Sequence, residues 1–252
     1  MRVWEAGDGE PLLLLHGLGG SGRYFERVAS RVDGRFRIVA PDLAGFGHSD
    51  EPDLDYGRAG HLDDLDAVMS DIGTRVVVAG HSLGGVFSAL WVARRPEAVR
   101  ALAIVAAPYP SPDASKVWIE EPAPPPASRI TMPLVAAAVR VLAVPVGVAK
   151  RFPPAVAADY ARQSLRARNR TMRSALYDPA VAEDLEQVRA LDGRFPTLVE
   201  HARDDRTVRF DAHERWSALL PSAERRVVEG GHQVQLRSGF RSLAEWLSAL
   251  PG

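Results

Sequence analysis

The sequence predicts an α/β fold in which helices cover both faces of a mostly parallel β-sheet and a helical cap is inserted between two strands. Short apolar runs alternate with longer segments whose apolar residues recur at helical spacing, and this alternation favours parallel strands joined by helical crossovers. Between residues 108 and 191 the alternation lapses, and then it resumes. Because so long a stretch without regular structure is uncommon in a compact domain, an insertion with its own helices is expected.

The predicted strands are short apolar runs that end at glycine, proline or polar residues. The first run consists of four consecutive leucines, and a continuous apolar run is typical of a strand that is buried on both faces. The predicted strands are residues 12–15, 36–40, 76–79, 101–106, 197–200 and 225–228.

Each predicted helix of the core has one apolar face. In residues 62–72, apolar side chains recur every three or four positions, as in an amphipathic helix. The helix at 86–95 is expected to stop before Pro96, whose ring disfavours helical geometry at the preceding residue. The predicted core helices are residues 24–32, 62–72, 86–95, 211–219 and 240–250.

The insertion divides the chain into two predicted units, a core of residues 1–107 and 192–252 and a cap of residues 108–191. Residues 122–126 form a proline-rich stretch that indicates an extended linker. Two helical patterns follow it, at 132–144 and 155–173.

Composition excludes several classes of protein. The 252 residues carry a formal net charge of -1, so the basic excess of a nucleic-acid-binding protein is missing. The absence of cysteine excludes disulfides, thiolate metal sites and a cysteine nucleophile. A signal peptide needs an apolar run near its start, but acidic residues follow the first four positions. The longest apolar segment, 134–148, contains Arg140 and Pro145 and is too short for a membrane-spanning helix. We therefore expect a cytoplasmic protein without stable membrane insertion.

A serine lies between the predicted strand at 76–79 and the predicted helix at 86–95. The five residues Gly80, His81, Ser82, Leu83 and Gly84 match G-x-S-x-G, in which a sharp strand-to-helix turn exposes the serine hydroxyl. Glycines suit the flanking positions because a side chain there collides with the neighbouring strand or helix. A glycine-rich turn that contains serine by chance is the alternative explanation.

Two further motifs extend the pattern. Residues 16–20 read His-Gly-Leu-Gly-Gly, and residues 42–49 match D-x-x-G-x-G-x-S. Together with residues 80–84, these motifs make the chain resemble the α/β-hydrolase family, in its esterase-like branch with a serine nucleophile and a helical cap. The resemblance implies an oxyanion loop at 16–20, a nucleophile at Ser82 and, further along the chain, an acid and then a histidine.

Asp205 is the acid that the resemblance implies. Residues 201–208 are similar to the family's G-x-x-D-x-x-V loop, with Ala202 in place of the usual glycine. Asp204 is the alternative, and Asp113, after the fourth predicted strand as in some relatives, is a weaker one.

His232 is the implied catalytic histidine, because it follows Gly230 and Gly231 after the last predicted strand. The other histidines are expected to support structure, with His81 pointing away from the apex of the turn. They are His16, His48, His61, His81, His201 and His213.

The resemblance implies a serine hydrolase that cleaves a carboxylic ester through an acyl-enzyme, with Ser82, His232 and Asp205 as a catalytic triad. The backbone N–H groups of Leu18 and Leu83 are expected to form the oxyanion hole. The alternatives are a thioesterase or lactonase, a carbon–carbon bond hydrolase, and a ligand-binding protein on the same fold. No cofactor or metal is implied. The expected partner is a small-molecule acyl ester, or a carrier-protein or coenzyme thioester.

The cap carries two candidate substrate contacts. Its apolar residues are expected either to pack on the core or to line an acyl pocket above Ser82; they are Met132, Leu134, Val135, Val139, Leu142 and Val144. Four arginines recur at helical spacing and form either a solvated face or an attractive surface for an anionic substrate; they are Arg162, Arg166, Arg170 and Arg173.

Overall fold

The computed structural model describes residues 1–32, 34–50, 56–70, 72, 74–113, 154–236 and 240–251. The predicted linker at 122–126, the predicted helix at 132–144 and the apolar residues proposed for an acyl pocket lie outside this part of the chain.

The core of the molecule is a seven-stranded sheet with the order β1-β3-β2-β4-β5-β6-β7. β1 pairs with β3 in antiparallel orientation, and every other pair is parallel. The predicted mostly parallel sheet is therefore confirmed. The strands are β1 (Arg2–Ala6), β2 (Glu10–Leu15), β3 (Phe36–Asp42), β4 (Val76–His81), β5 (Val99–Val105), β6 (Thr197–Ala202) and β7 (Glu224–Val228).

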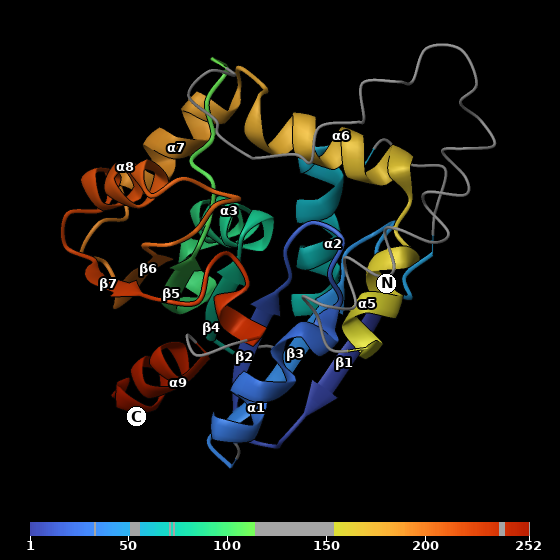
Figure 1. Cartoon of the computed structure of the whole chain (residues 1–252). Coiled ribbons are helices and arrows are strands. Elements are labelled where there is room, and N and C mark those ends of the chain that lie inside the picture. The colour runs from blue at the N-terminus through green and yellow to red at the C-terminus, as the bar shows by residue number, and fades with distance from the viewer. Residues whose placement is uncertain are drawn as a thin grey trace, which may run out of the picture.

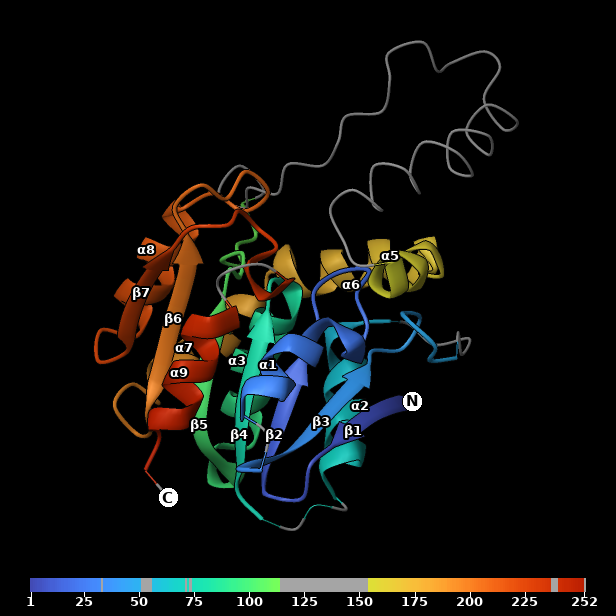
Figure 2. The ribbon, with the colours of Figure 1, turned by 60° about the horizontal axis from the view of Figure 1, so that its bottom comes forward.

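Helices cover both faces of this sheet, as Figures 1 and 2 show. On one face, α1 (Glu26–Val32) packs against α9 (Phe240–Ala249). The other face is covered by α2 (Arg58–Ser70), α3 (Leu83–Arg94), α7 (Val181–Arg189) and α8 (Asp211–Leu219). The predicted arrangement of helices on both faces is confirmed.

The four leucines of β2 show why the sequence folds in this way. Side chains alternate across a strand, so Leu13 and Leu15 enter the hydrophobic cluster beneath α3, while Leu12 and Leu14 enter the cluster beneath α1 and α9. All four are completely buried. Burying a leucine side chain contributes about 1.5 to 3 kcal/mol, so this run stabilises β2 as an interior strand, between β3 and β4.

Two helices of the predicted cap lie at the carboxyl ends of the strands, α5 (Pro154–Ala161) and α6 (Leu165–Leu176). The prediction of one helix over 155–173 is wrong, because the chain leaves helical geometry before Ser164. The Ser164 hydroxyl accepts a hydrogen bond from the Ala167 N–H and caps α6, and the Ser164 N–H donates to the Gly45 carbonyl of the core at 3.0 Å.

One strand and one α-helix of the described chain are additional to the predicted ones. β1 is a partly exposed edge strand with a weak apolar signal. α7 lies within the predicted cap, yet its buried residues Val181, Leu185 and Val188 join the hydrophobic cluster of the core beside α3. Their spacing of four and then three residues is that of a helix face and indicates α7 in the sequence.

Candidate active site

Ser82 lies at a sharp turn between β4 and α3, close to the carboxyl edge of the sheet. Its backbone has φ 55° and ψ -125°, a conformation that residues other than glycine rarely adopt. The Ser82 N–H donates to the Val105 carbonyl at 2.8 Å, and the Ser82 carbonyl accepts from the Gly85 N–H at 2.9 Å. These bonds to β5 and α3 hold the strained residue in place.

The glycines beside Ser82 are required by close backbone approach. A Cβ on Gly80 would lie 2.2 Å from the Gly84 carbonyl oxygen, and a Cβ on Gly84 would lie 2.1 Å from the Leu15 carbonyl oxygen. No side chain fits at either position. Tight packing of α3 against β4 and β2 therefore explains both glycines of the G-x-S-x-G motif.

His232 connects Ser82 with Asp205. Its Nε2 lies 2.9 Å from Ser82 Oγ, and its Nδ1 lies 2.8 Å from Asp205 Oδ2. A carboxylate only accepts, so Nδ1–H donates to Asp205, and the Ser82 hydroxyl donates to the unprotonated Nε2. The three residues follow β4, β6 and β7, and the structure brings them together in one hydrogen-bonded series, which we call the Ser82–His232–Asp205 series.

Asp205 is buried and fully engaged by donors. Its Oδ1 accepts from the N–H groups of Thr207 at 2.7 Å and Val208 at 2.9 Å, while Oδ2 faces His232 and, at 3.3 Å, Nε2 of His201. Burial alone raises the pKa of a carboxyl group, but hydrogen bonds from His201 and His232 outweigh it and hold the pKa of Asp205 well below its ordinary value. The carboxylate is therefore ionised at neutral pH.

The alternative acids occupy other positions. Asp204 Oδ1 accepts from the N–H groups of Gly230 and Gly231, each at 3.0 Å, and these bonds, led by that of Gly231, lower the pKa of Asp204. Asp204 thus holds the loop before His232, whereas Nδ1 of His232 bonds to Asp205. Asp113 is exposed, and its backbone N–H donates to Ser111 Oγ.

The loop at residues 16–20 lies against the nucleophile turn. A Cβ on Gly17 would lie 3.0 Å from Ser82 Cβ. His16 shapes this loop: its Nε2 accepts from the Leu43 N–H at 3.0 Å, so Nδ1 carries the proton and donates to the Gly17 carbonyl at 2.8 Å. Burial lowers the pKa of His16, which keeps the ring in this neutral form.

The N–H groups expected to form the oxyanion hole belong to Leu18, in the loop at 16–20, and to Leu83, which follows Ser82. Leu83 is the first residue of α3, where backbone N–H groups have no carbonyl acceptor within the helix. Within the described residues, no backbone carbonyl accepts from the Leu18 N–H. Neither N–H group is therefore committed to a backbone carbonyl in the described structure.

His81 supports the loop that carries His232, and no sequence pattern predicts this contact. Its ring is buried, stacks on Tyr24 with 5.1 Å between centroids, and donates from Nε2 to the His232 carbonyl oxygen at 2.7 Å. Burial and then the proximity of His232 lower the pKa of His81 to about 3. A neutral His81 therefore holds the backbone of His232 in place.

His61 and His213 contact residues outside the Ser82–His232–Asp205 series. Nε2 of His61 lies 2.8 Å from Thr171 Oγ1 of α6, and burial lowers the pKa of His61 to about 4. His213 stacks on Phe210, and burial lowers its pKa to about 4. Both rings are neutral at pH 7.

The helix α5 contacts the core beside the loop at 16–20. Asp159 of α5 is 1% exposed and accepts from the Ser21 hydroxyl at 2.7 Å. His48 lies between Asp159 and Asp42, with Nδ1 at 3.6 Å and 3.7 Å from their carboxylate oxygens. Asp42 also accepts from the Gly22 N–H at 2.6 Å. These contacts attach the cap to the D-x-x-G-x-G-x-S turn.

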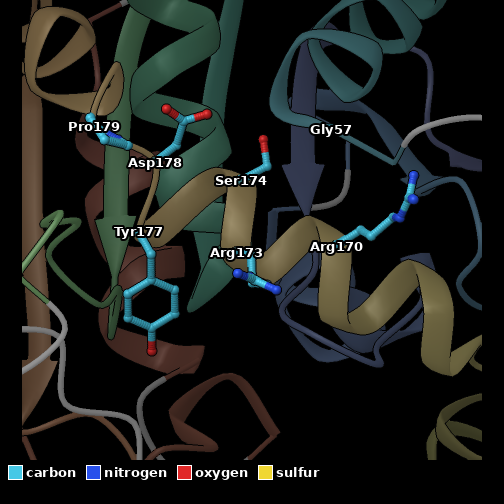
Figure 3. A pocket seen from close by; sticks show the side chains of 7 residues that line it. All are labelled: Gly57, Arg170, Arg173, Ser174, Tyr177, Asp178 and Pro179. Atoms are coloured by element: carbon cyan, nitrogen blue, oxygen red, sulfur yellow. The ribbon is translucent and has the colours of Figure 1, made fainter.

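A pocket of about 460 Å³ lies beside α6 (Figure 3). Arg170 and Arg173 extend from α6 at this pocket, and Asp178, which pairs with Arg58, adds a negative charge. The pocket is lined by Gly57, Arg170, Arg173, Ser174, Tyr177, Asp178 and Pro179. None of these residues belongs to the Ser82–His232–Asp205 series.

The predicted arginine stripe is shorter than expected. Arg166, Arg170 and Arg173 are exposed on α6, whereas Arg162 is exposed in the turn before it. The break before Ser164 separates them, so a single stripe of four arginines on one helix is wrong.

The described residues also bear on two other properties, metal binding and membrane spanning. In the described part of the chain, no three histidine, aspartate or glutamate side chains gather closely enough to hold a metal ion. None of the helices in that part combines the length and the apolar character needed to cross a bilayer.

A model of the alpha/beta hydrolase family matches residues 12–245 of the chain. Among curated proteins, Lipase 3 of Moraxella sp. (strain TA144) is 37% identical over 100 residues, which are 38% of this chain and 31% of that protein. The haloalkane dehalogenase of Agrobacterium fabrum is 33% identical over 100 residues, which are 39% of this chain and 33% of that protein. The chain thus spans about a third of the length of these relatives.

Among solved structures, an esterase from Exiguobacterium antarcticum is similar with a TM-score of 0.75. The likeness covers 98% of this chain and 93% of that chain at 19% sequence identity. At this identity it shows that the two chains share a fold.

Proposed function

Because the chain belongs to the α/β-hydrolase family, we propose that it is a serine hydrolase that cleaves a carboxylic ester through an acyl-enzyme. Ser82 is the nucleophile, His232 the general base and then the general acid, and Asp205 the group that orients His232. The observation that carries the proposal is the Ser82–His232–Asp205 series, with 2.9 Å and 2.8 Å between the bonded atoms. A serine hydroxyl needs such a base within hydrogen-bond reach to become an effective nucleophile.

Acylation begins when Ser82 Oγ attacks the carbonyl carbon of the ester and its proton passes to Nε2 of His232. The carbonyl oxygen becomes an oxyanion. As the tetrahedral intermediate collapses, the Nε2 proton passes to the leaving alkoxide and an alcohol departs. Water then attacks the acyl-enzyme with the same assistance, releasing the carboxylic acid and restoring the Ser82 hydroxyl.

The negative charge that develops on the substrate oxygen needs donors fixed in advance. We assign this role to the backbone N–H groups of Leu18 and Leu83. Removing one such donor costs about 3 to 4 kcal/mol of transition-state stabilisation in a well-studied protease. Asp205 stabilises the imidazolium form of His232 that exists while the oxyanion is present.

We also assign residues 1–107 and 192–252 to the catalytic core and residues 108–191 to a cap. The contact of Asp159 with Ser21 supports a cap that covers the loop at 16–20. The packing of α7 in the core cluster suggests that the last part of this insertion serves the core.

A carboxylic ester is favoured because a lipase is among the curated proteins to which the chain is similar, at 37% identity over 100 residues. Thioesters of a coenzyme or a carrier protein are the second candidate, since Arg170 and Arg173 offer positive charge at a pocket on α6. Lactones, carbon–carbon bonds beside a carbonyl, and ligand binding without turnover are further alternatives.

The test combines turnover with covalent labelling. The purified chain is assayed with p-nitrophenyl esters of graded acyl length and with acyl-coenzyme A thioesters of the same lengths, and is treated with a fluorophosphonate. We expect ester hydrolysis and a covalent adduct on Ser82, both lost in Ser82→Ala. Turnover that persists in this variant would contradict the assignment of Ser82, and labelling of Ser82 without turnover of any substrate would favour the ligand-binding alternative.

A further inference from the structure

A second histidine, His201, lies beside the same carboxylate oxygen of Asp205 that accepts from His232. His201 is the fifth residue of β6 and is 1% exposed. Its Nε2 lies 3.0 Å from the Val208 carbonyl oxygen and 3.3 Å from Asp205 Oδ2. In the sequence, His201 is one of several histidines to which no motif assigns a role, because G-x-x-D-x-x-V begins at the next residue.

The proton on His201 can be assigned from its neighbours. A carbonyl oxygen only accepts hydrogen bonds, so the contact with Val208 requires a proton on Nε2 of His201. The same N–H lies near Asp205 Oδ2, and it is therefore shared between the two oxygens. His201 thus donates to the carboxylate oxygen that also accepts from Nδ1 of His232.

We propose that His201 is a positioning residue of the active site, which holds Asp205 Oδ2 in line with His232 Nδ1 and shares its negative charge. The proposal rests on the proposed catalytic roles of Ser82, His232 and Asp205. With two backbone donors on Oδ1 and two histidines on Oδ2, the carboxylate cannot rotate without losing a hydrogen bond. A fixed orienting group preserves the geometry on which proton transfer depends.

The electrostatic surroundings agree with this role. Burial raises the pKa of Asp205, and the hydrogen bond from His201 is the first of the interactions that reverse this effect. Other titratable and charged groups also face this cluster. They are His213 of α8, with its ring 6.3 Å from that of His201, and Tyr24, His81, Asp204, Arg203 and Arg225.

His201 also affects the basicity of His232. A carboxylate that shares its charge with a second donor stabilises the imidazolium form of His232 less than one that does not. Removing the His201 donor is therefore expected to strengthen the bond between Asp205 and protonated His232. The acid limb of the pH profile of kcat/KM is then expected to move to higher pH.

The experiment compares three variants of the full chain with the same p-nitrophenyl ester. His201→Leu removes the donor, whereas His201→Gln keeps an N–H at the same number of bonds from the backbone. His213→Leu is the matched control, because it removes a neighbouring buried histidine that has no hydrogen bond to Asp205 in the described structure. The readouts are kcat, KM, the pH dependence of kcat/KM, and the thermal midpoint.

We expect His201→Leu to lower kcat about tenfold, the weaker end of the range for a hydrogen bond to a charged group. KM changes little because His201 is buried behind Asp205. The acid limb of the pH profile of kcat/KM moves to higher pH by roughly half to one pH unit. His201→Gln restores kcat and the acid limb, and His213→Leu leaves the acid limb at its wild-type position.

The proposal is overturned if His201→Leu keeps the wild-type acid limb, if His213→Leu shifts it equally, or if His201→Gln fails to restore it. Should His201→Leu not fold, ¹⁵N NMR of histidine in the wild-type chain remains decisive, because an unprotonated Nε2 on His201 would contradict the assignment. Failure of the proposed function is distinguishable, since the wild-type chain would then show neither ester turnover nor labelling of Ser82.

Discussion

Gly84 offers a way to perturb the proposed oxyanion hole, whose donors are backbone groups that side-chain substitutions at Leu18 and Leu83 leave in place. A Cβ on Gly84 would lie 2.1 Å from the Leu15 carbonyl oxygen and 2.5 Å from the His16 carbonyl oxygen. Carbon and oxygen in contact are ordinarily about 3.3 Å apart. Because both obstacles are backbone atoms, Gly84→Ala must separate α3 from the end of β2 by roughly 1 Å.

This separation acts directly on the candidate site, because Leu15 and His16 lead into Leu18. A displacement of about 1 Å in catalytic geometry can cost a factor of about 100 in rate, and overpacking a core costs about 1 to 3 kcal/mol. We expect Gly84→Ala to lower kcat/KM for a p-nitrophenyl ester about 100-fold. Its thermal midpoint is expected to fall by roughly 2 to 4 °C for each kcal/mol lost.

Gly60 provides the matched control. It lies exposed in α2, and a Cβ there would meet no atom within 4 Å. Gly60→Ala is expected to raise the free energy of unfolding by about 0.5 to 1 kcal/mol, because alanine favours a helix, and to leave kcat/KM unchanged. If Gly84→Ala retains wild-type kcat/KM and stability, the close-approach argument is refuted. If the activity lost in Gly84→Ala equals the fraction of the variant that is unfolded, the link to the oxyanion hole is refuted.

Two further predictions concern carboxyl groups of the β6 region. Asp205→Asn is expected to lower kcat about 10⁴-fold, as the loss of a triad acid does elsewhere. Asp204→Asn is expected to leave kcat nearly unchanged, because asparagine keeps an oxygen that accepts from the N–H groups of Gly230 and Gly231. Equal losses of kcat in the two variants, measured in steady-state assays, would contradict the assignment of Asp205. Burial raises the pKa of Glu200 from 4.5 to about 7, so the folded chain holds the proton of the Glu200 carboxyl group more tightly than the unfolded chain does. The free energy of unfolding is therefore highest below pH 4.5 and falls as the pH rises to about 7. Glu200→Gln is therefore expected to be about 3 kcal/mol more stable than wild type at pH 8 and equally stable near pH 4.5. Urea unfolding measures the free energy of unfolding of both chains, and the same difference between them at both pH values would contradict this reasoning.

The sequence was sufficient for those features that depend on local pattern. The leucines of β2 predicted a strand buried on both faces, because no polar residue interrupts them and the structure buries all four. The G-x-S-x-G motif predicted a strand, a turn and a helix in that order, and β4, Ser82 and α3 follow it. Asp205 was selected by its place in the loop that resembles G-x-x-D-x-x-V, and His232 by its place after the last predicted strand. The structure brings both into one hydrogen-bonded series with Ser82.

Other features depend on contacts that no local pattern contains. The helix predicted at 155–173 is broken before Ser164, because the Gly45 carbonyl of the core accepts from the Ser164 N–H. His201 and His81 stood among several equivalent histidines in the sequence. Their hydrogen bonds to Asp205 and to the His232 carbonyl arise from the meeting of β4, β6 and the loop after β7, and only the fold brings these elements together.

The identity of the residue at position 82 separates the reactions named for the two relatives, a lipase and a haloalkane dehalogenase. A carboxylate nucleophile that displaces a halide forms an ester with the enzyme, and water can attack the carbonyl carbon of that ester to regenerate the carboxylate. A serine hydroxyl that displaced a halide would form an ether, which has no carbonyl carbon for water to attack. Attack of Ser82 on a carbonyl carbon instead forms an ester, which water returns to serine and a carboxylic acid. With Ser82 as the proposed nucleophile, we therefore expect turnover of carbonyl substrates and none of alkyl halides.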